Sequence, residues 1–155
     1  MKLSIELRPR PLLHGLLAVV LVWAAIGKIA NLQEFYSLML GYRLPIPPPL
    51  LRVAAITLPW LEMISGIFLM LKSTRAAALA WASALFALFS AVTLQAWLRG
   101  LHINCGCLDL SLVGLRADSA LAASLESAGF AFLRAVVLGL VAVYLFLSRP
   151  MASTP

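Results

Sequence analysis

The sequence predicts an all-α fold, a four-helix transmembrane bundle with short interfacial helices in the outer loops. Hydrophobic residues make up 63% of the 155 residues and charged residues only 12%, against roughly 25% in an ordinary soluble domain. The mean hydropathy is +0.99. Four apolar stretches reach about 20 residues, the length that a helix needs to cross a bilayer. We expect a single membrane domain covering residues 1–155.

The predicted spans cover about residues 11–30, 50–71, 75–98 and 130–148. The first follows Lys2, Arg8 and Arg10, as the apolar core of a signal peptide would. That core is long for a signal peptide, and no small-x-small cleavage pattern follows before Lys28, so a retained anchor is favoured.

The basic residues indicate a lipid bilayer as partner and no nucleic acid. The net charge is +6, but the cations stand at the ends of apolar runs, where lipid headgroups lie. Four spans place both termini on one side, and six of the twelve basic residues fall on each side. The six basic residues on the terminal side are concentrated in much shorter segments than the six on the other side. The positive-inside rule then predicts cytoplasmic termini in a bacterial inner membrane, with the loops after the first and third spans in the periplasm.

The connections also carry local signals. Asn31 and Glu34 have the spacing of a capping box, which predicts a short helix from about Leu32 to Leu40 that ends at Gly41. The prolines between residues 45 and 49 prevent its continuation. The tight turn at residues 72–75 makes the second and third spans antiparallel neighbours. Asp118 or Ser119 is expected to cap another short helix before the fourth span.

The third span is rich in small residues. Ala76, Ala80 and Ala84 recur every four positions. Stripes of this kind let helix backbones approach closely in lipid, so we expect this face to pack inside the bundle.

The two cysteines, Cys105 and Cys107, are separated only by Gly106. A disulfide requires Cα atoms within about 7 Å, and the glycine permits the backbone angles that such a small ring needs. A bridge across one residue stabilises a fold very little, because the stabilisation grows with the length of the closed loop. Strained, exposed disulfides are the labile ones. The pair is therefore interpreted as a redox-active couple in an oxidising compartment.

Metal binding is the main alternative. His102, Cys105 and Cys107 lie within six residues, and thiolate and imidazole ligands suit Cu(I) or Zn. The chain has no second cluster of cysteine and histidine, so a closed site would need a mixed ligand set or two chains. A surface role is the simplest interpretation of His102.

Glu62 lies near the middle of the second span, where an ionisable group costs about 2.5–3.5 kcal/mol on insertion scales. It should face the bundle interior, be protonated or pair with a cation. Pro59 removes a backbone donor one turn earlier, and a kinked helix with a buried carboxyl indicates a polar cavity. That cavity is a candidate quinone pocket. Glu62 could equally serve only to hold helices together.

Two further cations lie near the cysteine side. About 18 Å of helix separates Glu62 from the outer end of its span, whereas Lys28 lies close to that edge. A direct pair would require offset spans, so we expect Lys28 to extend to the headgroups or to meet Glu34. Arg134 could lower the pKa of a cysteine thiol, contact an anionic partner or extend to the headgroups. Gln95 could line the same pocket.

The segments Trp23–Lys28, Phe35–Pro49, Leu58–Glu62 and Cys105–Cys107 together resemble the methylamine utilisation MauE family of DoxX-like membrane proteins. The resemblance covers about residues 12–147. Leu108-Asp109 stands where family members often have Phe-Gly, and the last loop is longer than usual. The family is associated with making methylamine dehydrogenase, whose small subunit is periplasmic and dense in disulfides.

The resemblance implies a thiol–disulfide oxidoreductase role in periplasmic disulfide formation, with Cys105 and Cys107 as the working pair. It also implies a thioredoxin-like periplasmic protein as partner and the small subunit of methylamine dehydrogenase as client. Lys28 and Glu62 match positions that the family tends to keep. The alternatives are a non-enzymatic assembly scaffold, a metal-handling membrane protein and a small subunit of a quinone-linked oxidoreductase.

Overall fold

The computed structural model describes residues 9–101 and 127–148. This part of the chain is all-α, as predicted, and it contains five helices. They are α1 (Pro9–Ala30), α2 (Leu32–Gly41), α3 (Pro48–Met70), α4 (Arg75–Leu98) and α6 (Ala128–Leu147). All but α2 are long and apolar enough to cross a membrane, and their bounds agree with those of the four predicted spans to within two residues at each end. The helix expected at Asp118 or Ser119 lies outside the described residues.

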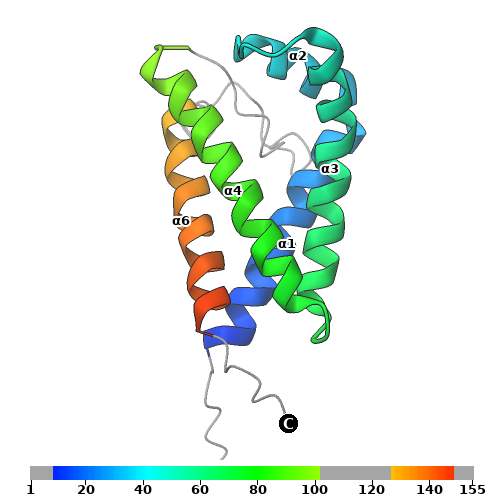
Figure 1. Ribbon diagram of the computed structural model, residues 1–155, viewed down its shortest axis with the longest axis vertical. Helices are drawn as coiled ribbons and strands as arrows, with labels where there is room; N and C mark the ends of the chain where they lie inside the picture. The colour runs from blue at the N-terminus through cyan, green and yellow to red at the C-terminus, as the bar shows by residue number, and fades with distance from the viewer. Residues whose placement is uncertain (1–8, 102–126, 149–155) are drawn as a thin grey trace, which may run out of the picture.

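The bundle consists of two helix pairs. α1 packs along α3, α4 packs along α6, and the α3–α4 contact joins the two pairs (Figure 1). The first residues of α1 and the last residues of α6 lie at one end of the bundle, and α2 lies at the other (Figure 1). The main core is apolar and contains side chains from all four long helices, among them Leu17, Leu69, Leu79, Phe86 and Leu145.

The helix α2 lies across the first turns of α3. Its Phe35 and Met39 pack against Leu51 and Ala55. The helix begins and ends where the sequence predicts, but the Asn31 side chain makes no cap hydrogen bond. The Asn31 amide instead donates to the Gly27 carbonyl at 3.2 Å, so α1 runs almost directly into α2. The expected capping box is therefore not formed.

The packing face of α4 differs from the expected one. Ala76, Ala80 and Ala84 are exposed on the bundle surface, whereas Ala78 and Ala82 are buried. The buried alanines share their face with large side chains, including Leu79 and Phe86, that fill the core. Since alanines occur all around α4, their spacing alone could not select the correct face.

The ends of α4 and α6 are tied together at the α2 end of the bundle. The Trp97 ring stacks on Phe132, with 6.2 Å between ring centroids and 19° between the planes. Gly129 lies against the same indole, where an added Cβ would come within 3.3 Å of Nε1. The Ser127 side chain accepts a hydrogen bond from the Phe130 amide and caps α6. Both helix ends that flank residues 102–126 are thus held by direct contacts.

Candidate functional site: a buried ion pair between two cavities

The centre of the site is an ion pair between Lys28 of α1 and Glu62 of α3. The Lys28 Nζ donates a hydrogen bond to the Glu62 Oε1. The side chains are only 2% and 1% exposed. A buried charge is tolerated when a partner and hydrogen bonds compensate for its lost hydration, and each residue supplies the other's counter-charge.

This pair corrects the expectation that Lys28 extends to the headgroups or meets Glu34. Glu62 lies fourteen residues after Pro48, which is about 21 Å of helix, whereas Lys28 lies two residues before the end of α1. The two residues meet because α3 extends past the end of α1, and α2 packs against this extra length of α3. The spans are offset, which is the condition that the sequence-based argument required for a direct pair.

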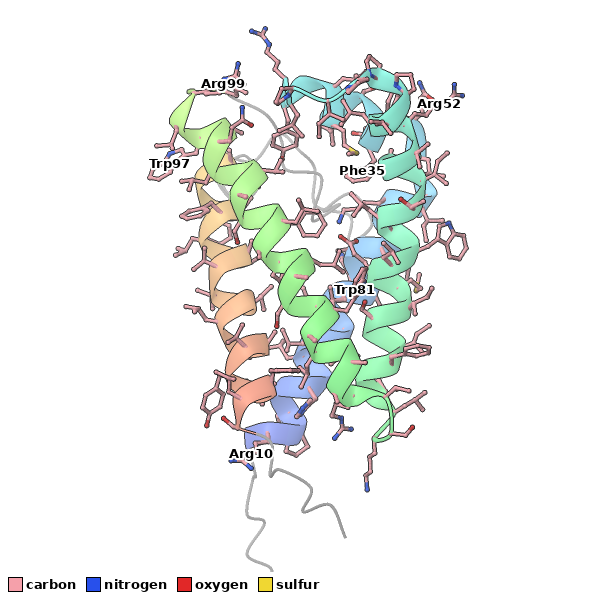
Figure 2. The ribbon with its side chains drawn as sticks, in the orientation of Figure 1. Arg10, Phe35, Arg52, Trp81, Trp97 and Arg99 are labelled. Carbon is pink, nitrogen blue, oxygen red and sulfur yellow. The ribbon has the colours of Figure 1, made fainter. Side chains whose placement is uncertain are left out.

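Two aromatic rings flank the Lys28 ammonium. Its Nζ lies 4.7 Å from the centroid of the Phe89 ring of α4 and 5.4 Å from that of the Phe35 ring of α2. Phe35 points from α2 toward the bundle interior (Figure 2). Cation–π contacts are worth about 2 kcal/mol or more when desolvated, so these rings add to the attraction of Glu62. Both phenylalanines were missed by sequence reasoning, because nothing in a Phe-rich membrane sequence distinguishes a ring beside a cation.

Two cavities meet at Lys28. The first, which we call the ion-pair cavity, has a volume of about 140 Å³ and lies among α1, α3, α4 and α6. Lys28, Glu62 and Arg134 all line it, so three of the site residues expected from the sequence come together here. The Glu62 Oε2 is buried and has no hydrogen-bond partner among the described residues.

The second, which we call the α2-side cavity, has a volume of about 210 Å³. Its lining is almost wholly apolar, and among the described residues Lys28 is the only charged one that lines it. The lining residues are Lys28, Phe35, Met39, Tyr42, Leu44, Ile46, Leu51, Ala54, Leu58, Leu88, Phe89, Val92 and Thr93. The walls thus come from α1, α2, α3, α4 and the connection between α2 and α3.

Gln95 lines neither of these cavities, contrary to its expected place. Its Nε2 lies 3.5 Å from the Tyr42 carbonyl oxygen, toward which it donates. Gln95 therefore links α4 to the end of α2 instead of facing the ion pair.

The residues Cys105, Cys107 and His102 lie outside the described part of the chain. The segment that contains them leaves the described structure at Leu101 and rejoins it at Ser127. Within residues 9–101 and 127–148, no group of three histidine, cysteine, aspartate or glutamate side chains could hold a metal ion. The metal alternative for His102 and the two cysteines stays a prediction.

The sequence model of the family described as methylamine utilisation protein MauE matches residues 9–148. The chain belongs to the MauE family. Two curated proteins with the same description are similar to it. The one from Methylophilus methylotrophus is 38% identical over 103 residues, covering 63% of this chain and 54% of that protein. The one from Paracoccus denitrificans is 34% identical over 92 residues, covering 59% and 49%.

The chain spans about half the length of these curated MauE relatives. No solved structure matches it. The MauE match includes Lys28, Glu62, Arg134 and the Cys105–Cys107 segment within its range. Together with the four apolar helices, it identifies a multi-pass membrane protein.

Proposed function

We propose that this member of the MauE family is a thiol–disulfide oxidoreductase that forms disulfides in a periplasmic client during methylamine utilisation. The observation that carries the proposal is the Cys105-Gly106-Cys107 sequence, which contains both cysteines of the chain. A bridge over one residue contributes little to stability, so its chemistry is the better reason for its presence. By the family resemblance, the client is the disulfide-rich small subunit of methylamine dehydrogenase, and a thioredoxin-like periplasmic protein is the partner.

The proposed reaction begins with a client thiolate that attacks one sulfur of the Cys105–Cys107 disulfide. The S–S bond breaks as a mixed disulfide forms, and the other cysteine leaves as a thiolate. A second client thiolate then attacks the mixed disulfide. The client gains one disulfide and loses two electrons, and Cys105 and Cys107 are left reduced.

The test is to trap this mixed disulfide. Replacing one cysteine, by Cys105→Ser or Cys107→Ser, leaves a single thiolate that can attack the disulfide of the oxidised client or partner in the reverse direction, and no second cysteine of this chain remains to resolve the mixed disulfide. We expect one of the two variants to give a higher-mass band on a non-reducing gel that reductant removes, and mass spectrometry of the band would identify the partner. The double Cys→Ser variant is the control. If both cysteines of the wild type stay free in cells, with equal reactivity before and after reduction, the proposal is wrong.

We further propose cytoplasmic termini and a periplasmic cysteine segment in the inner membrane. Lys28 is buried against Glu62, and Arg134 lines the ion-pair cavity, so neither counts as a loop charge. The cysteine side then keeps four cations between the spans or near their ends, Arg43, Arg52, Arg99 and Arg116, against six on the terminal side. The positive-inside rule favours the side with more basic residues as cytoplasmic. Figure 2 shows Arg52 and Arg99 at the α2 end and Arg10 at the opposite end.

Thiol labelling from outside the cell checks this orientation. In intact cells treated with reductant, a membrane-impermeant maleimide should label Cys107 in the Cys105→Ser variant. The matched control is Ser73→Cys in the double Cys→Ser background, because Ser73 is exposed in the α3–α4 turn at the other end of the bundle. We expect this control to be labelled only after lysis. The reverse pattern would place the cysteines in the cytoplasm and remove the basis of an oxidising role.

A further inference from the structure

The Lys28 ammonium has more hydrogen-bonding capacity than the described residues use. It carries three N–H donors, and one of them bonds to the Glu62 Oε1. The rings of Phe35 and Phe89 flank it, and they offer π faces instead of acceptor atoms. Lys28 also lines the α2-side cavity, and it is the one charged side chain that residues 9–101 and 127–148 contribute to that lining. Because an ammonium donates and never accepts, an occupant of this cavity should present an acceptor oxygen to Lys28.

The side chains that line the α2-side cavity indicate what the remainder of the bound molecule should be like. Phenylalanine, leucine and methionine side chains dominate its lining, and these favour an apolar or aromatic body. Three of the helices that line the cavity, α1, α3 and α4, are long and apolar enough to cross a membrane, which favours an occupant that arrives from lipid.

The volume sets the size of that body. A cavity of about 150 Å³ lined by apolar side chains admits a benzene molecule in another protein. The α2-side cavity, at about 210 Å³, has room for a six-membered ring with substituents.

We propose that the α2-side cavity binds the ring of a lipid-soluble quinone, with the Lys28 ammonium donating a hydrogen bond to one quinone carbonyl oxygen. Lys28 would be a binding residue in this site, held in position by Glu62. The role of the quinone as electron acceptor rests on the proposed function, whereas its binding rests on the cavity and on Lys28.

A quinone can accept the electrons and protons that the proposed reaction leaves on the two cysteines. Each client disulfide leaves Cys105 and Cys107 as two thiols. Their reoxidation breaks two S–H bonds, forms one S–S bond and releases two electrons and two protons. Both electrons and both protons pass to the quinone, whose two carbonyl oxygens become hydroxyls. A cation beside a carbonyl oxygen stabilises the negative charge that develops there as electrons arrive.

The experiment titrates the full-length protein, in lipid nanodiscs, with a decyl-substituted benzoquinone by calorimetry. Ala54→Phe places a ring in the cavity and leaves Lys28 and Glu62 unsubstituted, because Ala54 lines the cavity from α3. Val53→Phe is the matched control, since the adjacent Val53 is 57% exposed on the outer face of the same helix. We expect Ala54→Phe to weaken quinone binding at least tenfold and Val53→Phe to leave it unchanged. Equal binding by the wild type and Ala54→Phe would overturn the proposal.

Decylbenzene tests the role assigned to Lys28, because it has a ring and tail of the same kind but no carbonyl oxygen. We expect it to bind more weakly than the quinone. Equal affinity for both ligands would show a merely apolar pocket and overturn the assignment. Val92→Phe fills the same cavity from α4 and replaces Ala54→Phe if that variant does not fold.

The double Cys→Ser variant separates the two proposals. We expect it to bind the quinone with wild-type affinity but to lose dithiol-dependent quinone reduction. A wild type that binds the quinone and does not reduce it supports the cavity assignment and counts against the proposed function. A wild type that does not bind the quinone overturns the cavity assignment and leaves the mixed-disulfide test intact.

Discussion

Replacing Lys28 by methionine should lower the free energy of unfolding by about 3–5 kcal/mol, because it leaves the Glu62 carboxylate buried without its counter-charge. Glu62→Gln should have a comparable effect, since it leaves the Lys28 ammonium buried without its counter-charge. A single charge in the middle of a span costs about 2.5–3.5 kcal/mol on insertion scales, which is consistent with an effect of this size. The measurement is reversible unfolding in detergent micelles titrated with sodium dodecyl sulfate.

The double variant Lys28→Met/Glu62→Leu distinguishes an ion pair from ordinary packing. Removing both charges removes the desolvation cost together with the attraction, and such replacements are often neutral or stabilising. We therefore expect the double variant to be more stable than either single variant, which requires a coupling energy larger than the loss of about 3–5 kcal/mol in each single variant. Lys72→Met, in the exposed α3–α4 turn, is the control and should change stability by less than about 0.5 kcal/mol. Additive losses in the double variant would show that the charges do not interact.

Gly66→Ala should destabilise the bundle by about 1–3 kcal/mol, the usual effect of overpacking. Gly66 of α3 faces α1 so closely that an added Cβ would lie 2.7 Å from the Val22 Cγ2 and 3.0 Å from the Ala18 carbonyl oxygen. The Val22 side chain can rotate away, but the backbone oxygen can move only if α1 moves. Thermal unfolding in detergent would measure the loss.

Gly15→Ala is the matched control for Gly66→Ala. Nothing lies within 4 Å of a Cβ added at Gly15, in α1. The better helix propensity of alanine should then stabilise this variant by up to about 1 kcal/mol. Gly66→Ala combined with Val22→Ala should recover part of the loss, because the Ala18 contact remains. If both glycine variants behave alike, the helices do not approach as closely as described.

The four spans could be predicted from the sequence because each is set by the length and hydropathy of its own segment. The predicted ends fall within two residues of the observed ones. The short helix α2 could be predicted for the same local reason, since Gly41 and the following prolines end it.

The Lys28–Glu62 contact could not be predicted in this way. It depends on how far α3 extends past α1, where α2 packs against Leu51 and Ala55. Hydropathy gives the length of each span but not its depth relative to a neighbour. The α2-side cavity depends on the same offset, so its position beside the ion pair could not be predicted from the sequence either. The buried face of α4 could not be selected, because alanines surround that helix.

The contacts among Trp97, Gly129 and Phe132 have a consequence for the chain between α4 and α6. They join the ends of α4 and α6 next to Leu101 and Ser127, the two residues between which the cysteine-bearing segment lies in the sequence. If the proposed thiol–disulfide exchange takes place in that segment, these contacts favour an unchanged stacking of α4 on α6 during the reaction. We would then expect a partner protein to meet the same helix ends before and after each exchange.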